Sequence, residues 1–118
     1  MYGTVKLGEK DVPMMANAAT PIRYKQVFGK NLLKYFMGEA SPEDMAAMVS
    51  DLAYIMTKAA AGADMNKLNI DEYIDWLDEF GAMDFVEQEN VEAIMAIYKG
   101  NDRVASKAKK NQGRLKEK

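Results

Sequence analysis

A cluster of carboxylates at residues 71–79 is the part of the chain best equipped for chemistry. Asp71, Asp75 and Asp78 recur at spacings of four and three, so a helix would present them on one face. Carboxylates grouped in this way can bind a metal ion or take part in acid–base catalysis. No histidine or cysteine is available to complete such a site, and acidic residues near a helix start also favour the helix dipole. We therefore predict a solvated acidic face, with a docking surface for a basic partner and a metal site as the alternatives.

A second cluster, Asp64, Asn66 and Asn69, has some of the residue types of a calcium-binding loop. The pattern fails because Leu68 stands at a ligand position and Asn69 replaces the turn glycine. No phosphate-binding loop, dinucleotide-binding motif or hydrolase nucleophile motif occurs. Histidine, the commonest acid–base catalyst near neutral pH, is missing. The sequence therefore predicts a protein that is not an enzyme and that binds neither a cofactor nor a metal.

The composition is that of one small domain. A chain of 118 residues, 48% of them hydrophobic, can bury a core without disulfide bonds. The lack of cysteine suits a reducing cytoplasm. The apolar segments are short and interrupted by charge, so we expect neither a signal peptide nor a membrane-spanning helix.

The elements that would position these residues are a hairpin and a series of helices. Residues 4–7 and 12–15 are predicted to pair as a β-hairpin around a turn that contains Gly8. Apolar spacing predicts helices at about 21–28, 32–37, 42–61, 70–80 and 83–99. The predicted fold class is α+β, mainly α: a small bundle of four to five helices with an N-terminal β-hairpin. Residues 1–100 would form this single domain.

The helix after Ser41 has the clearest signals. Ser41 can accept a hydrogen bond from the first turn, and Pro42 suits the first helical position. Its predicted core face consists of Met45, Met48, Val49, Leu52, Ile55, Met56 and Ala59. Asn69 is predicted to cap the following helix. The predicted core face of that helix consists of Ile70, Tyr73, Ile74, Leu77 and Phe80.

The last predicted helix, over residues 83–99, is expected to turn its apolar side chains toward the core. The side chains concerned are Phe85, Val86, Val91, Ile94, Met95 and Tyr98.

The stretch from Ala16 to Gly38 mixes basic and aromatic residues with two glycine breaks. Thr20 is predicted to cap a helix that starts at Pro21 and stops at Gly29. Its core face is expected to be Ile22, Val27 and Phe28. The next predicted helix would turn Leu32, Leu33, Phe36 and Met37 inward.

Five residues are candidates for a partner-binding surface: Arg23, Tyr24, Tyr35, Met37 and Trp76. We expect Tyr24 and Tyr35 to be exposed, because exposed aromatic and arginine side chains are enriched in binding hot spots. Methionine adapts to varied apolar partners, and Met37 lies near a helix end. Trp76 falls beside an apolar stripe, where it would cap the core or anchor an interface. Alanine at Tyr24 or Arg23 is expected to weaken binding and spare folding.

Residues 101–118 hold seven basic and two acidic residues, although the whole chain has a net charge of −2. With few apolar side chains to bury, this segment is predicted to be a mobile basic tail. A solvated tail, contact with an acidic protein and contact with nucleic acid are the alternatives. The segment offers no aromatic ring on which a base could stack, which makes nucleic acid the less favoured partner.

The run A-x-A-A-T-P-I-R-Y-x-Q-x-F-G-K-x-L-L, from Ala16 to Leu33, resembles the start of the first helix in a known family. That family is the tail assembly chaperones of long-tailed (siphovirus-type) phages and prophages of Gram-positive bacteria. The rest of the chain is similar to the family in its length and in the order of its elements.

The resemblance implies a function without catalysis. Such chaperones coat the helical tape measure protein, keep it soluble and help to recruit tail tube subunits. A longer form made by ribosomal frameshifting contacts the tube protein in many of these phages. The resemblance also implies a location in the cytoplasm of the bacterial host and absence from the mature virion. Association with further copies of this chain stays open.

Two other functions fit the sequence. A small regulatory or nucleic-acid-binding protein would use the basic tail, and its binding would weaken steeply as salt rises. A structural head–tail connector subunit would form a defined ring in the finished particle. The chaperone hypothesis instead predicts binding to an apolar helical client that survives moderate salt.

Overall fold

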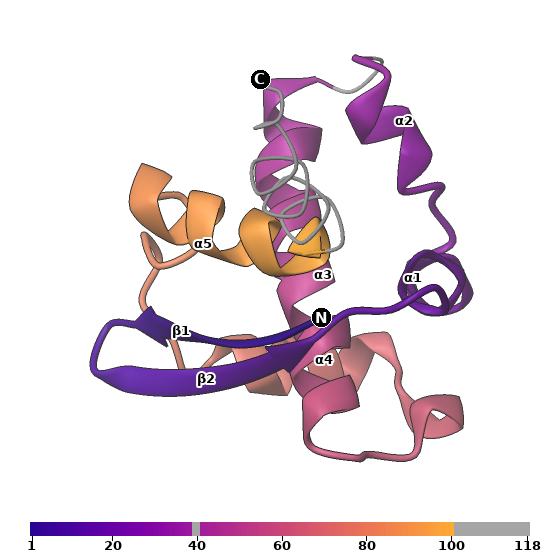
Figure 1. Cartoon of the computed structure of the whole chain (residues 1–118), viewed down its shortest axis with the longest axis horizontal. Coiled ribbons are helices and arrows are strands. Elements are labelled where there is room, and N and C mark those ends of the chain that lie inside the picture. Colours follow the sequence, from indigo (N-terminus) through magenta and orange to yellow (C-terminus); the bar gives the residue numbers. More distant parts are fainter. Residues whose placement is uncertain (39–40, 101–118) are drawn as a thin grey trace, which may run out of the picture.

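A β-hairpin and five α-helices make up the described part of the chain, which confirms the predicted α+β, mainly α class (Figure 1). The computed structural model describes residues 1–38 and 41–100, so the predicted tail at 101–118 lies outside the described residues. In chain order the elements are β1 (Tyr2–Leu7), β2 (Lys10–Met15), α1 (Thr20–Phe28), α2 (Leu33–Phe36), α3 (Pro42–Ala60), the 3₁₀ turn η1 (Met65–Lys67), α4 (Ile70–Leu77) and α5 (Gln88–Tyr98).

The hairpin has one buried and one exposed face. Its strands pair in antiparallel register, and the turn between them passes through Gly8, whose φ of 64° suits glycine. The buried face consists of Val5, Leu7, Val12 and Met14. It packs against α3 and α5. A side chain at Gly3 would come within 3.0 Å of Ile97, so glycine there lets α5 lie close to β1.

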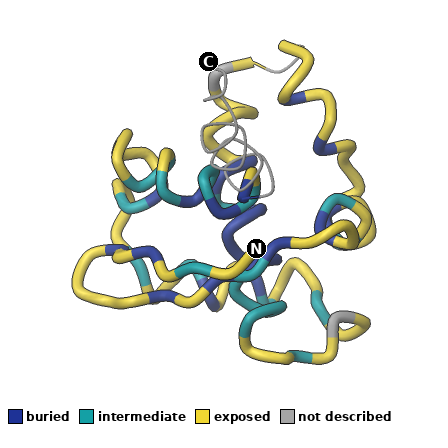
Figure 2. Tube along the Cα trace, in the orientation of Figure 1, coloured by how far each residue is buried: buried dark blue, intermediate teal, exposed yellow. Residues whose placement is uncertain are grey.

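The helix α3 forms the centre of the core and runs through the middle of the molecule (Figure 1). It begins as predicted, with the Ser41 hydroxyl accepting a hydrogen bond of 3.1 Å from the Asp44 N–H. All residues from 51 to 56 are buried, including Leu52, whereas the first turns of α3 are largely exposed (Figure 2). Contacts with β2, α1, α4 and α5 surround this central part. It is therefore enclosed on every side rather than amphipathic.

Three predicted helix boundaries are wrong. Thr20 belongs to α1 instead of capping it, and its hydroxyl accepts a hydrogen bond of 2.9 Å from the Asn17 N–H before the helix. Asn69 caps α4 as predicted, but this helix already ends at Leu77. The last helix starts only at Gln88. The segment between these two helices forms turns instead of helix.

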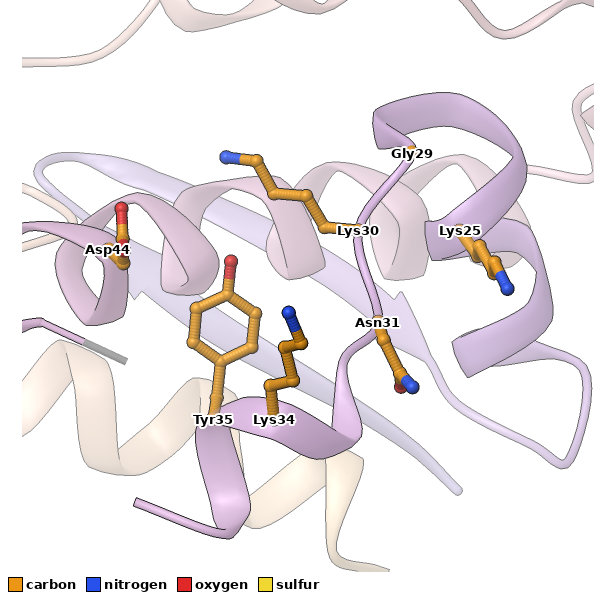
Figure 3. A pocket seen from close by; sticks show the side chains of 7 residues that line it. All are labelled: Lys25, Gly29, Lys30, Asn31, Lys34, Tyr35 and Asp44. Atoms are coloured by element: carbon orange, nitrogen blue, oxygen red, sulfur yellow. The ribbon is translucent and has the colours of Figure 1, made fainter. Parts of the chain in front are cut away.

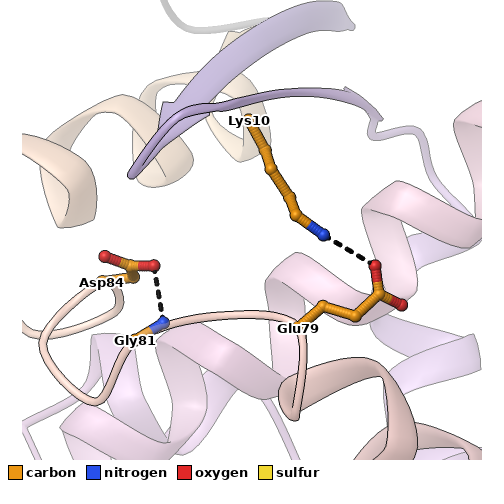
Figure 4. A network of polar contacts seen from close by, with 4 residues as sticks. All are labelled: Lys10, Glu79, Gly81 and Asp84. Carbon is orange, nitrogen blue, oxygen red and sulfur yellow. Dashed lines mark hydrogen bonds and ion pairs between the residues drawn. The ribbon is translucent and has the colours of Figure 1, made fainter.

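The turns between α4 and α5 are held by polar contacts (Figure 4). The Gly81 N–H donates a hydrogen bond of 2.8 Å to the Asp84 carboxylate. Lys10, near the hairpin turn, forms an ion pair of 2.9 Å with Glu79. The hairpin is therefore joined to the end of α4 by a charged contact as well as to α3 by apolar packing.

Several apolar side chains that were predicted to face the core are exposed. They are Ile22, Leu33, Phe36, Met37, Met45, Ile70, Ile74 and Val86. Most of these residues lie on the short helices α1, α2 and α4. A helix of four to nine residues can carry apolar side chains on two faces. Which of the two faces is buried then depends on the neighbouring element, and the spacing of the residues does not predict it.

Candidate binding surface

Tyr24 is a core residue. Its side chain is 0% exposed, so the expectation that it forms a surface is wrong. Its hydroxyl donates a hydrogen bond of 3.2 Å to the carboxylate of Asp51, a buried residue of α3. The face of α1 that carries Tyr24 therefore packs on α3, which turns Ile22 outward and leaves it 60% exposed.

Burial shifts the titration of this pair. It raises the pKa of the Tyr24 hydroxyl well above its usual range, so this hydroxyl stays a donor. Burial also raises the pKa of the Asp51 carboxyl, although the hydroxyls of Tyr73 and Tyr24 favour its charged form. The Tyr73 hydroxyl lies 2.8 Å from the Ser50 hydroxyl, which extends the polar network across α3. This network supports the core rather than a reactive site.

Tyr35 and Trp76 are also buried, and both belong to a continuous chain of aromatic rings. The Tyr35 ring meets the Tyr24 ring edge-on, with 6.3 Å between their centroids. Trp76 contacts the rings of Tyr54, Tyr73, Phe80 and Phe85. Trp76 is thus a core residue rather than a half-exposed cap. These rings can support surface residues that pack on them, but they are not part of the surface themselves.

Arg23 and Met37 are the two candidates that reach the surface. Arg23 is half-buried, and its guanidinium donates hydrogen bonds of 3.4 Å to Gln26 and to Asn66 beside η1. Met37 is 67% exposed at the end of α2. The five predicted residues do not form one exposed site, because Tyr24, Tyr35 and Trp76 are buried. Whether any of them contacts a partner stays a prediction.

A hollow of about 390 Å³ lies between α1, α2 and the start of α3 (Figure 3). Its lining residues are Lys25, Gly29, Lys30, Asn31, Lys34, Tyr35 and Asp44. The Lys30 and Lys34 side chains extend into the space beside Tyr35, whereas Lys25 points away from it (Figure 3). Two lysines that extend into it and one carboxylate in its wall make this hollow cationic.

A second hollow of about 450 Å³ adjoins the first on the outer side of α1. It is lined by Pro21, Ile22, Lys25, Gln26 and Asn31. Because Lys25 and Asn31 line both hollows, the two are neighbours on this flank, one with a cationic lining and one with a largely apolar lining, and together they are treated as one groove with a cationic end and an apolar end. We call this the α1–α2 groove.

Sequence reasoning missed this groove, although a signal for it exists. Between Asp11 and Glu39 the chain has no acidic residue and four basic ones: Arg23, Lys25, Lys30 and Lys34. Residues 39–100, in contrast, contain fourteen acidic residues and three basic ones. The segment that forms α1 and α2 is thus a cationic surface on an acidic domain.

The acidic face predicted on α4 is present, since Asp71, Asp75 and Asp78 are all exposed. Among the described residues, no group of three or more His, Cys, Asp or Glu side chains is placed to hold a metal ion. Within residues 1–38 and 41–100, no helix has the length and apolar character needed to cross a membrane.

Comparison with known proteins adds no assignment: no protein-family model, no curated protein and no solved structure matches this chain.

Proposed function

We propose that this protein is a tail assembly chaperone of a long-tailed phage or prophage. In this role it binds and solubilises the tape measure protein and helps to recruit tail tube subunits. It acts in the cytoplasm of the bacterial host and leaves before the virion is complete. The tube subunits are contacted through a longer, frameshifted form of the chain.

One observation carries this proposal. The segment that resembles the chaperone family, Ala16–Leu33, is also a segment that leaves large apolar side chains in water. Ile22 is 60% exposed and Leu33 is 61% exposed, and Met37 follows just after this segment. Large apolar side chains left exposed are typical of a protein-binding site, and Ile22 among them lines the apolar end of the α1–α2 groove. The resemblance and the exposed surface therefore point to the same part of the chain.

The expected client suits such a surface. By the family resemblance, a tape measure protein is a long helix with apolar stripes, which would aggregate without cover. A helix of this kind binds by laying its apolar side chains, spaced three and four residues apart, into a groove on its partner. The α1–α2 groove has an apolar end with Ile22 in its wall.

Co-expression with the long helical protein encoded just downstream tests the proposal. We expect a soluble stoichiometric complex in pull-down and size-exclusion experiments at moderate salt, with the client insoluble alone. Ile22→Asp and Leu33→Asp should abolish the complex, because they place charge on the apolar contact. Ile70→Asp is the matched control, since it introduces the same charge at a residue of α4 that is 47% exposed. A client that is soluble alone and forms no complex would refute the proposal.

A further inference from the structure

The α1–α2 groove has two kinds of chemistry along one surface. Ile22, Lys25 and Gln26 are three and four residues apart on α1, so they share its outer face. Lys30 and Lys34 continue the groove beyond Gly29 into the hollow beside Tyr35 (Figure 3). An occupant that contacts both ends must therefore present apolar groups next to anionic ones.

The lysines of the groove have charge to offer to such an occupant. The ion pairs formed within the described residues are Lys10–Glu79 and Lys58–Glu72. Lys25, Lys30 and Lys34 thus have no carboxylate within ion-pair distance in that part of the chain, although the Lys30 ammonium acts from further away on the carboxylate of Asp51, where burial raises the pKa and this ammonium lowers it. Asp44, in the first turn of α3, is the acidic residue in the wall of the groove.

We propose that the α1–α2 groove recognises an amphipathic helix with carboxylates beside its apolar stripe. This inference rests on the proposed function and adds the chemistry of the client segment. Apolar side chains of the client would pack at the Ile22 end, and its aspartates or glutamates would pair with Lys30 and Lys34. Charge complementarity of this kind sets the register and orientation of a bound helix.

A protein helix fits this groove better than a nucleic acid does. Proteins that bind single-stranded nucleic acids typically combine a basic groove with exposed aromatic faces on which bases stack. The aromatic residue that lines the groove, Tyr35, is buried. Asp44 in the wall would also repel a continuous row of phosphates, whereas the carboxylates of a helix can be spaced to avoid it.

Two helical peptides of about 18 residues, or roughly five turns, test the chemistry with the full-length protein. Both carry leucine at every third or fourth position; one has glutamate beside each leucine, and the other has glutamine there. We expect the glutamate peptide to bind more tightly by fluorescence anisotropy, and the difference to shrink as salt rises. Equal affinities would overturn the inference.

Variants of the groove should change the affinity for the glutamate peptide in opposite directions. Lys30→Gln with Lys34→Gln should weaken binding roughly 2- to 30-fold. Asp44→Asn should strengthen it roughly 1.5- to 5-fold, because it removes the repelling charge. Lys6→Gln with Lys67→Gln is the matched control, because it removes two exposed lysines outside the groove.

The outcomes separate the inference from the proposed function. A tape measure complex that forms equally well with the Lys30/Lys34 variant would overturn the inference and leave the chaperone function standing. Failure of the wild-type protein to form that complex would refute the function itself. Tighter binding of a single-stranded oligonucleotide than of the glutamate peptide, lost in the same lysine variant, would assign the groove to nucleic acid and overturn the inference.

Discussion

The centre of α3 and the α1–α2 flank use similar apolar side chains in opposite ways. Leu52 is completely buried in α3, whereas Leu33 in α2 is 61% exposed. The difference arises from enclosure, because α3 is surrounded by four elements and α2 is a single turn at the edge. Residue type alone therefore does not separate the core of this protein from its exposed surface.

The two regions also treat charge differently. Asp51 lies in the core among tyrosine hydroxyls, and burial raises the pKa of its carboxyl. Lys30 and Lys34 line an open hollow instead. A buried charge costs stability unless it is well paired, whereas a charge beside solvent costs little and remains available to a partner. We expect substitutions in the enclosed centre of α3 to act on folding, and substitutions of the exposed side chains of α1 and α2 to act on binding.

The largest expected effect is the difference between an aspartate at Leu52 and an aspartate at Leu33. Leu52→Asp should prevent folding, because a buried unpaired charge costs more than a domain with a stability of about 5–15 kcal/mol can tolerate. Leu33→Asp should change the free energy of unfolding by no more than about 0.5 kcal/mol. Far-UV circular dichroism and urea unfolding measure both effects. A soluble, fully helical Leu52→Asp protein would show that the core has been wrongly placed.

A smaller effect is expected where the two regions meet. Tyr24→Ala should destabilise the protein by about 3–5 kcal/mol, because it removes a buried ring. Tyr24→Phe should cost about 1–3 kcal/mol, since it leaves Asp51 without the hydrogen bond from that hydroxyl. Urea unfolding of both variants gives these values. The expected loss of stability replaces the sequence-based expectation that alanine at Tyr24 spares folding. Unchanged stability in both variants would contradict the new prediction and support the earlier one.

The smallest effect concerns the pH dependence of stability. The pKa of Asp51 is higher in the folded state than in the unfolded state. At a pH between these two values, the carboxyl is therefore protonated in the folded protein and ionised in the unfolded one. The stability that Asp51 contributes is therefore fully present below its usual pKa and is lost as the pH rises through the raised value. Asp51→Asn keeps an acceptor for Tyr24 but cannot titrate.

Urea unfolding from pH 4 to pH 8 tests this sign. The stability of Asp51→Asn relative to the wild type should increase with pH and then level off. The total increase should be about 1.4 kcal/mol for each unit by which the folded pKa of Asp51 exceeds the unfolded one. A difference that stays constant across this range, or that decreases, would show that Asp51 does not titrate with a raised pKa.

The sequence predicted those parts of the fold that local signals determine. Ser41 and Asn69 cap the helices expected of them, and the hairpin turns at Gly8. The buried faces of the short helices were not predictable from spacing alone. In α1, both Ile22 and Tyr24 offer an apolar surface, and contact with α3 decides that Tyr24 is buried.

The α1–α2 groove lies in a stretch that the sequence marked as unusual, but its lining residues were not predicted. The stretch from Ala16 to Gly38 was singled out, and it forms most of the α1–α2 groove. The aromatic residues favoured there are buried, while Lys30 and Lys34 line the groove instead. The groove needs residues from α1, α2, the turn between them and α3, so it exists only after the elements have packed. The acid-free run between Asp11 and Glu39 was the local sign of it.

The enclosed run of α3 also constrains how this sequence can diverge over generations. In an amphipathic helix, only every third or fourth position touches the core, and the others drift freely. From residue 51 to residue 56 every side chain is buried, so a change at any of them needs a matching change in a neighbouring element. The outer faces of α1 and α2 carry no such constraint from folding. Substitutions can therefore accumulate there while the scaffold stays fixed.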